Sequence, residues 1–225
     1  MRILFITKDF LIEPLGIMSL SAVLKEAGHQ TDIIKCDLED VEAKMMDFDP
    51  GIVAYSVCTG QHKYYRDINL RLKESFDFIA VFGGPHPTFF NEFINEPGVD
   101  IICLGEGEEA MVELADRIKN NQAFTDILNL CVKEQDKIIK NSVRPLIDIE
   151  KLPFPDRELI AKYPKSFNHP VKNFFWGRGC PYNCPYCFNH SLKQLYQGRG
   201  AYVRLRSIES LLKEKNSFRH PSKRS

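Results

Sequence analysis

Three cysteines near the C-terminal end of the sequence have the spacing of metal ligands. Cys180, Cys184 and Cys187 follow a C-x3-C-x2-C pattern, and no further cysteine comes after them. Because an iron–sulfur cluster is normally held by four thiolates, three thiolates can bind three irons of a [4Fe-4S] cluster and leave the fourth iron open to a non-protein ligand. The glycines and prolines around the cysteines exclude a regular helix and favour a loop. The pattern therefore predicts a loop that holds a cluster with one open iron.

Two other interpretations of these cysteines remain open. His190 follows Cys187 by three residues, so it could complete a tetrahedral zinc site with the three thiolates. The cysteines could also belong to a purely structural loop, because short motifs match by chance. Metal analysis separates the three interpretations, since iron with sulfide, zinc alone and no metal are distinct outcomes.

The composition narrows the class of protein. The chain has 225 residues, 44% of them hydrophobic, with 30 basic and 30 acidic side chains, which is typical of a globular protein of one domain or one and a half. A formal net charge of zero argues against a broad nucleic-acid-binding surface. Lys8 and Asp9 come too early for a signal peptide, and no apolar run is long enough to span a bilayer. We therefore expect a cytoplasmic protein with no nucleic-acid partner and no membrane span.

The four remaining cysteines occur singly. They lie in or beside apolar runs, where a free cysteine usually behaves as a small buried hydrophobe: Cys36, Cys58, Cys103 and Cys131. A reducing compartment suits both groups of cysteines, because the closely spaced three need free thiols to bind metal.

Short apolar runs alternate with helical patterns over about the first 120 residues. The predicted strands cover residues 2–6, 31–35, 52–55, 78–82 and 101–104. The predicted helices cover residues 17–27, 61–75, 88–94 and 107–120. Strands that alternate with helices in this way form a parallel sheet covered on both faces. The sequence therefore predicts an α/β domain over residues 1–125.

The second half of the chain is organised differently. Two strand-like runs at 130–133 and 137–140 predict a hairpin, expected as a small appendage, and a proline-rich stretch to residue 170 predicts a semi-rigid connector. A predicted strand at 173–176 leads into the cysteine loop, a predicted helix at 207–215 follows it, and the basic tail after Ser217 is expected to fray. We thus expect a hairpin and linker over 126–170 and a second unit over 171–225. This second unit is too short for a closed β/α barrel, which predicts an incomplete domain or a fragment of a longer enzyme.

Four loops follow predicted strands, at residues 14–17, 55–61, 83–88 and 105–108. Because the carboxyl ends of parallel strands meet at one edge of a sheet, these loops are expected on one rim, where open α/β sheets bind ligands. Glycines there allow the backbone to approach a bulky ligand, and the hydroxyls of Ser56 and Thr59 can bind its polar tail. Taken singly, the same residues also fit simpler roles, because Ser56 and Thr59 could cap a helix and Glu106 could favour a helix dipole.

The cysteine motif, with Tyr186 directly before its last cysteine, resembles the signature of the radical SAM superfamily. The glycines and arginine at 177–179 and the prolines at 181 and 185 add to this resemblance. It implies that Cys180, Cys184 and Cys187 ligate a [4Fe-4S] cluster and that S-adenosylmethionine chelates the open iron. Tyr186 would then lie near the adenine.

The four loops, in this order before the cysteines, resemble the cobalamin-binding domain of the B12-dependent radical SAM family. This family includes anaerobic Mg-protoporphyrin monomethyl ester cyclases and many C-methyltransferases, and residues 152–157 match the linker between its two domains. The resemblance implies a flavodoxin-like (Rossmann-like) cobalamin-binding domain, then a hairpin and linker, then the first β/α unit of an incomplete radical SAM barrel. The residues implied at the cobalamin are Pro14, Leu15, Gly16, Ser56, Thr59, Gly60, Gln61, Gly83, Gly84, His86, Gly105, Glu106 and Gly107.

One departure concerns the cobalt ligand. The Asp-x-His-x-x-Gly loop of methionine-synthase-like proteins is absent after the first predicted strand, where the chain has Lys8, Asp9 and Phe10. By the resemblance, no protein histidine coordinates cobalt from below.

The resemblance also implies an activity. A 5'-deoxyadenosyl radical would be generated for methyl transfer or radical cyclisation on a small organic substrate, with ferredoxin or flavodoxin as electron donor. Two alternatives stay open: a truncated cobalamin-binding fragment without turnover, and a zinc-stabilised flavodoxin-like module.

Overall fold

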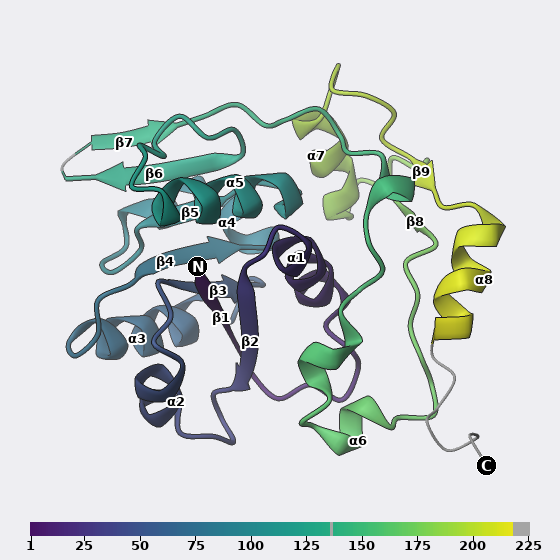
Figure 1. Ribbon diagram of the computed structural model, residues 1–225. Coiled ribbons are helices and arrows are strands. Elements are labelled where there is room, and N and C mark those ends of the chain that lie inside the picture. The colour runs from purple at the N-terminus through teal and green to yellow at the C-terminus, as the bar shows by residue number, and fades with distance from the viewer. Residues whose placement is uncertain (136, 218–225) are drawn as a thin grey trace, which may run out of the picture.

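The computed structural model describes residues 1–135 and 137–217, and the expectation for the tail lies outside these residues. Within them, the strands form a seven-stranded sheet in the order β2-β1-β3-β4-β5-β6-β7 (Figure 1). The strands are β1 Arg2–Thr7, β2 Gln30–Lys35, β3 Ile52–Ser56, β4 Ile79–Gly83, β5 Ile101–Cys103, β6 Leu130–Glu134 and β7 Lys137–Lys140. The first five are parallel, and their order is that of the flavodoxin-like fold, which confirms the predicted fold class.

The hairpin extends the sheet and is therefore not the small appendage that we expected. β6 pairs antiparallel with β5, and Ile102 lies opposite Cys131. The exposed edge of β5 would present unpaired backbone groups, and the apolar residues of β6 are buried when they cover it.

Helices cover both faces of the sheet. They are α1 Leu15–Glu26, α2 Val41–Phe48, α3 His62–Lys73, α4 Pro85–Phe89, the 3-10 helix η1 Asn91–Asn95 and α5 Glu108–Lys119. α1 and α5 pack against one face, and α2 and α3 pack against the other (Figure 1). The helix predicted at 88–94 is wrong in its bounds, because Pro85 starts α4 at its first turn and η1 follows as a separate element.

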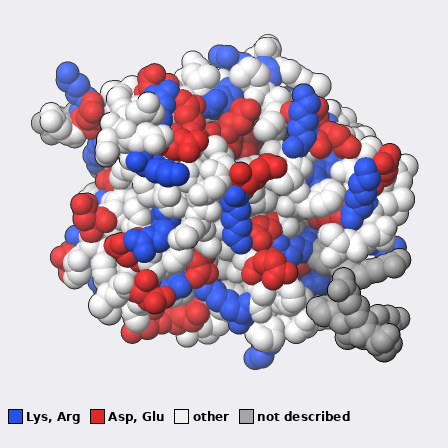
Figure 2. Space-filling model, viewed as in Figure 1, with Lys and Arg blue, Asp and Glu red and all other residues white. Residues whose placement is uncertain are grey.

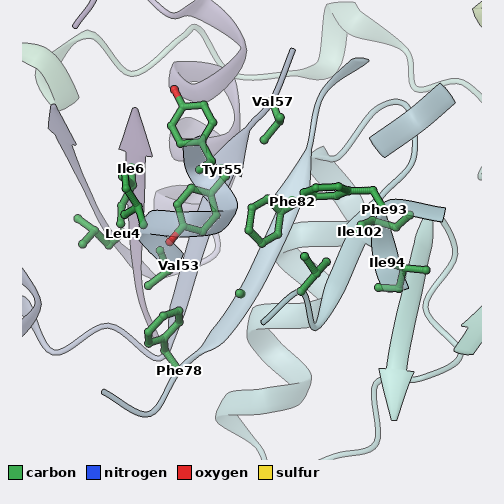
Figure 3. Packing of buried hydrophobic residues seen from close by; sticks show 14 of the residues in the cluster. Leu4, Ile6, Val53, Tyr55, Val57, Phe78, Phe82, Phe93, Ile94 and Ile102 are labelled. Atoms are coloured by element: carbon green, nitrogen blue, oxygen red, sulfur yellow. The ribbon is translucent and has the colours of Figure 1, made fainter. Parts of the chain in front are cut away.

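Alternate residues of each strand enter opposite cores, as the two-residue repeat of a strand requires. Leu4 and Ile6 of β1 pack on the α3 side with Val53 and Tyr55 of β3 (Figure 3). Phe5 faces α1 and α5. The strands therefore fix which residues face each layer of helices.

The linker and the C-terminal unit after it, which carries the cysteines, consist of short elements. They are η2 Ile149–Lys151, η3 Arg157–Ile160, α6 Pro164–Phe167, β8 Gly177–Arg178, α7 Phe188–Leu195, β9 Arg204–Leu205 and α8 Ile208–Ser217. The strand predicted at 173–176 is wrong, because only Gly177 and Arg178 pair with β9. The residues before them are held by other contacts: the N–H of Asn173 donates to Glu13, and Phe175 packs against the α1 and α5 core.

Buried charges join this unit to the first domain. Glu214 of α8 has a side chain that is 1% exposed, and it pairs with Arg157 at 2.9 Å and with Arg206 at 3.4 Å. Arg157 also pairs with Glu13, which follows β1. A loop after β1, the linker and α8 therefore meet in one ionic cluster.

On the surface, charges of both signs are interspersed over the face that carries α1 (Figure 2). This agrees with the balanced composition. No helix in residues 1–135 and 137–217 has the length and apolar character that crossing a membrane requires.

Candidate functional site

Residues 171–217 contain the three closely spaced cysteines and are here called the cysteine-bearing unit. A cavity of about 440 Å³ lies between the carboxyl ends of the parallel strands and this unit. The first domain contributes α1, the ends of β3 and β4, and the loop from β5 to α5. Its lining residues are Gly16, Ile17, Leu20, Ser56, Gly84, Pro85, Thr88, Phe89, Gly105, Glu106, Gly107 and Glu108. The opposite side is formed by Leu146, Phe175, Gly177, Arg178, Gly179, Phe188, Asn189, Leu192, Tyr196, Tyr202 and Arg204. The cavity is thus closed by two parts of the chain that are distant in sequence.

A narrower space of about 70 Å³, here called the slot, shares part of its lining with the cavity. It lies between the sheet and the helices α1 and α5. Its walls are mostly apolar: Phe5, Ile17, Leu20, Ala54, Val81, Cys103 and Met111. A bulky ligand in the cavity can therefore extend an apolar arm beneath the rim.

Two rim positions require glycine. Gly84 has a φ of +96°, and a Cβ there would lie 2.8 Å from the backbone nitrogen of Val57. Gly105 has a φ of +71°, and a Cβ there would lie 2.1 Å from the hydroxyl oxygen of Tyr196. Both positions combine a backbone conformation that L side chains rarely adopt with a close approach of neighbouring atoms.

The structure brings some of the predicted rim residues together and leaves others apart. Those that line the cavity or the slot are Gly16, Ser56, Gly83, Gly84, Gly105, Glu106 and Gly107. Those outside both linings are Pro14, Leu15, Thr59, Gly60, Gln61 and His86. Contacts between any of these residues and a ligand stay a prediction.

His86 packs beneath the rim. Its ring stacks on His62 with centroids 4.0 Å apart and on Phe90 at 5.1 Å, and its Nδ1 lies 3.2 Å from the hydroxyl oxygen of Thr59. Burial lowers the pKa of His86, and the neighbouring His62 lowers it further. The neutral imidazole is therefore favoured in the folded protein.

The loop from β5 to α5 binds the cysteine-bearing unit through two arginines. Both terminal nitrogens of Arg204 donate to the Glu106 carboxylate, at 3.0 and 2.6 Å. Arg178 pairs with Glu108, and it also lies 3.4 Å from Glu106. Burial alone would lower the pKa of Arg178, but the two carboxylates raise it above its usual value. The guanidinium therefore stays charged in this partly enclosed site.

Tyr196 makes a third contact to the same loop. Its hydroxyl accepts a hydrogen bond from the backbone N–H of Glu106 at 2.7 Å. Burial raises the pKa of Tyr196 to about 12. Sequence reasoning missed Tyr196, Arg178 and Arg204 as partners of this loop. Only Arg178 had a local signal, since it stands between two glycines before Cys180.

The cysteine loop runs from β8 to α7, and its three thiols are half-buried. A positive φ at Gly179 starts the loop, and the N–H of Cys187 donates to the carbonyl of Cys184 at 3.1 Å. In the described part of the chain, no three His, Cys, Asp or Glu side chains are arranged to hold a metal ion. The Nε2 of His190 lies 3.1 Å from the side-chain nitrogen of Gln194. The donor types suit a metal, and both metal binding and the identity of the metal stay predictions.

Tyr186 is 90% exposed, and its contact with S-adenosylmethionine also stays a prediction. Of the single cysteines, Cys103 and Cys131 are buried as expected, and Cys36 is partly buried. The expectation that Cys58 is buried is wrong, because its side chain is exposed in the loop after β3.

The first half of the chain matches a known domain profile. A profile described as "B12 binding domain" matches residues 1–115. An uncharacterized methyltransferase of Pyrococcus horikoshii, PH0819, is 32% identical over 185 residues, which are 77% of this chain and 40% of that protein. The anaerobic magnesium-protoporphyrin IX monomethyl ester cyclase of Synechocystis is 25% identical over 188 residues, 78% of this chain and 38% of that protein. The chain thus spans about 40% of the length of these relatives.

Two solved structures share the fold. The cobalamin-dependent S-adenosylmethionine radical enzyme OxsB, with aqua-cobalamin and S-adenosylmethionine bound, matches with a TM-score of 0.76 and 23% identity, over 96% of this chain and 31% of that chain. The radical S-adenosylmethionine methyltransferase TsrM from Kitasatospora setae matches with a TM-score of 0.72 and 16% identity, over 96% of this chain and 45% of that chain. Both likenesses extend through the cysteine-bearing unit as well as the sheet.

Proposed function

This chain belongs to the B12-binding domain family, and we propose that it binds cobalamin in the cavity, with the nucleotide tail of cobalamin in the slot. One observation carries the proposal: the cavity at the strand ends shares six lining residues with an apolar slot between the sheet and α1 and α5. A corrin ring needs a wide space with close backbone, and the rim supplies it at Gly84 and Gly105. An aromatic base on the tail suits the apolar walls of the slot, which must widen beyond about 70 Å³ to admit it.

The residues present fit such a ligand. Ser56 stands at the end of β3 and lines both spaces, so its hydroxyl can bind polar groups of the tail. Arg178 and Arg204 line the cavity together with Glu106 and Glu108, so polar substituents of the corrin can bind charged groups there. The chain's own part in the chemistry is therefore to hold the corrinoid below the cysteine loop and to shield it from water.

We further propose that Cys180, Cys184 and Cys187 hold a [4Fe-4S] cluster that binds S-adenosylmethionine. Three thiolates without a fourth leave one iron for a non-protein ligand, and the relatives with the same order of segments include S-adenosylmethionine radical enzymes. A cluster of this kind supplies one electron to the bound sulfonium. The chain's residues would orient it: Gly179 sets the start of the loop, and the Nδ2 of Asn189 lies 3.5 Å from the Cys187 sulfur.

The activity of the whole protein is proposed as methyl transfer or radical cyclisation on a small organic substrate. The support is that the relatives are named as a methyltransferase and as cyclases. A ferredoxin or flavodoxin would supply the electron, and the protein would be cytoplasmic. We also propose the division into a cobalamin-binding domain at 1–125, whose sheet is completed by the hairpin strands β6 and β7, a proline-rich linker from there to residue 170, and a radical SAM portion from 171.

Cobalamin titration tests the first proposal. The purified chain is titrated with aquacobalamin, and the corrin absorbance reports binding. Ala54→Leu fills the slot, and we expect at least about tenfold weaker binding because an overpacked slot cannot also hold the tail. Ala54→Ser, which adds little volume at the same site, should bind like the wild type. No binding by the wild type would overturn the proposal. Equal binding by Ala54→Leu would show that the tail does not lie in the slot.

Metal analysis tests the second proposal. After anaerobic reconstitution with iron and sulfide, we expect about four of each per chain. Replacing Cys180, Cys184 or Cys187 with Ser should abolish this content, whereas Cys58→Ser, in an exposed loop outside the motif, should not. One zinc per chain without iron or sulfide would instead support the zinc module.

A further inference from the structure

The loop at residues 105–108 takes part in two sets of contacts at once. On one side, Gly105 and Gly107 line both the cavity and the slot. On the other side, Glu106 and Glu108 of the same loop hold the unit that carries the cysteines. A change in the conformation of this loop must therefore affect both sets of contacts.

The contacts to the cysteine-bearing unit come from three of its elements. Arg178 belongs to β8, Tyr196 ends α7 and Arg204 belongs to β9. β8 and α7 are the elements that lead into and out of the cysteine loop. The loop at 105–108 thus contacts both ends of the segment that carries the thiols.

Arg178 connects directly to the first cysteine. It stands two residues before Cys180, and Gly179 between them has a φ of +88°. A Cβ on Gly179 would lie 2.1 Å from the carbonyl oxygen of Tyr202, so this backbone has little room to move. The position of the Arg178 backbone therefore determines where the cysteine loop begins.

The ion pair between Arg178 and Glu108 is largely enclosed. The two side chains are 18% and 6% exposed. Separating enclosed opposite charges is costly unless water or another partner replaces the contact. The loop at 105–108 is therefore expected to have two arrangements, one bound to the arginines and one released into solvent, rather than a continuum between them.

We propose that Arg178, Tyr196 and Arg204 are positioning residues that couple cobalamin binding to the placement of the cysteine loop, through residues 105–108. The inference rests on the proposed function. A corrinoid that touches Gly105 and Gly107 stabilises the loop conformation in which Glu106 and Glu108 face the arginines. By linkage, a cysteine loop held in place favours cobalamin binding by the same factor.

Hydrogen–deuterium exchange with and without aquacobalamin tests the inference, with residues 105–108 and 180–187 followed as separate peptides. Residues 180–187 are chosen because they do not line the cavity, so cobalamin does not cover them directly. In the wild type, cobalamin should slow exchange in both segments. In Arg178→Gln and in the double variant Glu108→Gln with Arg178→Gln, cobalamin should still slow exchange at 105–108 but not at 180–187. Cobalamin affinity should fall about fivefold or more, because coupling of this kind typically changes affinity by that factor.

The double variant leaves neither charge of the pair without its partner, so it guards against a failure to fold. Arg71→Gln is the matched control, since Arg71 on α3 pairs with Glu42 on α2, and both lie outside the cavity lining. If the wild type does not bind cobalamin, the proposed function fails. If it binds but residues 180–187 are unprotected, or stay protected in the variants, the coupling is wrong and the proposed function stands.

Discussion

The hydroxyl oxygen of Tyr196 accepts a hydrogen bond from the backbone nitrogen of Glu106 at 2.7 Å, across 90 positions of sequence. Tyr196 is 3% exposed, so this contact is shielded from water. It attaches the end of α7 to the loop that lines the cavity.

Replacing Gly105 with Ala should destabilise the fold by about 2 kcal/mol or more. The positive φ costs about 1–2 kcal/mol in a residue with a side chain, and the clash with the Tyr196 hydroxyl adds to it. Gly198→Ala is the control, because Gly198 has a φ of +74° and open space around it. Urea unfolding of both variants separates the steric effect from the backbone effect. Equal losses would show that the loop moves aside without cost.

Tyr196 should make the free energy of unfolding fall as the pH rises above 10. Its folded-state pKa of about 12 exceeds the ordinary value of 10.0, so both states are protonated below pH 10 and the full stability is present there. Between pH 10 and 12 the unfolded state ionises first, and the free energy of unfolding falls by about 3 kcal/mol. Tyr196→Phe should lack this part of the fall, as measured by unfolding at pH 9 to 12. The same pH dependence in both proteins would contradict the burial of this hydroxyl.

Glu214→Ala should destabilise the protein by about 3 kcal/mol, because it leaves Arg157 and Arg206 without a carboxylate that each now contacts. Glu209→Ala on the same helix is the control. Glu209 pairs with Lys213 at the surface, and both side chains are mostly exposed, so no measurable change is expected. Thermal unfolding at neutral pH compares the two variants. Similar losses in both would mean that α8 contributes through its charge rather than through this cluster.

His86 should make the free energy of unfolding decrease as the pH falls below 6.5. Its pKa in the folded protein lies below the ordinary value of 6.5, because of burial and of His62. The unfolded chain therefore binds the proton first as pH falls below 6.5, and stability that is present above this pH is lost. His86→Gln should reduce this loss, measured by urea unfolding at pH 7.5 and 5. His29, whose pKa is also lowered by burial, should account for a separate part that His29→Gln removes. If His86→Gln and the wild type lose the same stability between pH 7.5 and 5, His86 does not contribute to the pH dependence.

Much of the fold was predictable from local patterns. The strand runs at 2–6 and 52–55 alternate between two buried faces, and the structure places strands there. The sequence did not predict the helix α2, because only Val41 and Met45 of this helix are buried and two residues make no clear apolar repeat. The aromatic run at 174–176 suggests a strand, yet only Phe175 packs against the core and Trp176 is 59% exposed. The N–H of Asn173, just before the run, donates to Glu13 instead of pairing with a strand.

The candidate site was predictable only in part. The rim glycines Gly84 and Gly105 followed from their places after strands, and both line the cavity. His86 had the same local signal, but its ring stacks on His62 and lies outside the cavity. Ala54 and Val81 line the slot, but in the sequence they cannot be told from ordinary strand residues. The face on which a residue lies depends on register and on which helix covers it.

By itself, the sequence determined the kind of domain, the order of its segments and the three thiols that are proposed to bind iron. These properties depend on residues close together in the chain, so spacing alone carries them. Tertiary structure decided that Arg178, Tyr196 and Arg204 meet the loop at 105–108 over one cavity. Partners that are 70 to 98 positions apart leave no local pattern, because only the packing of the C-terminal unit on the sheet brings them together.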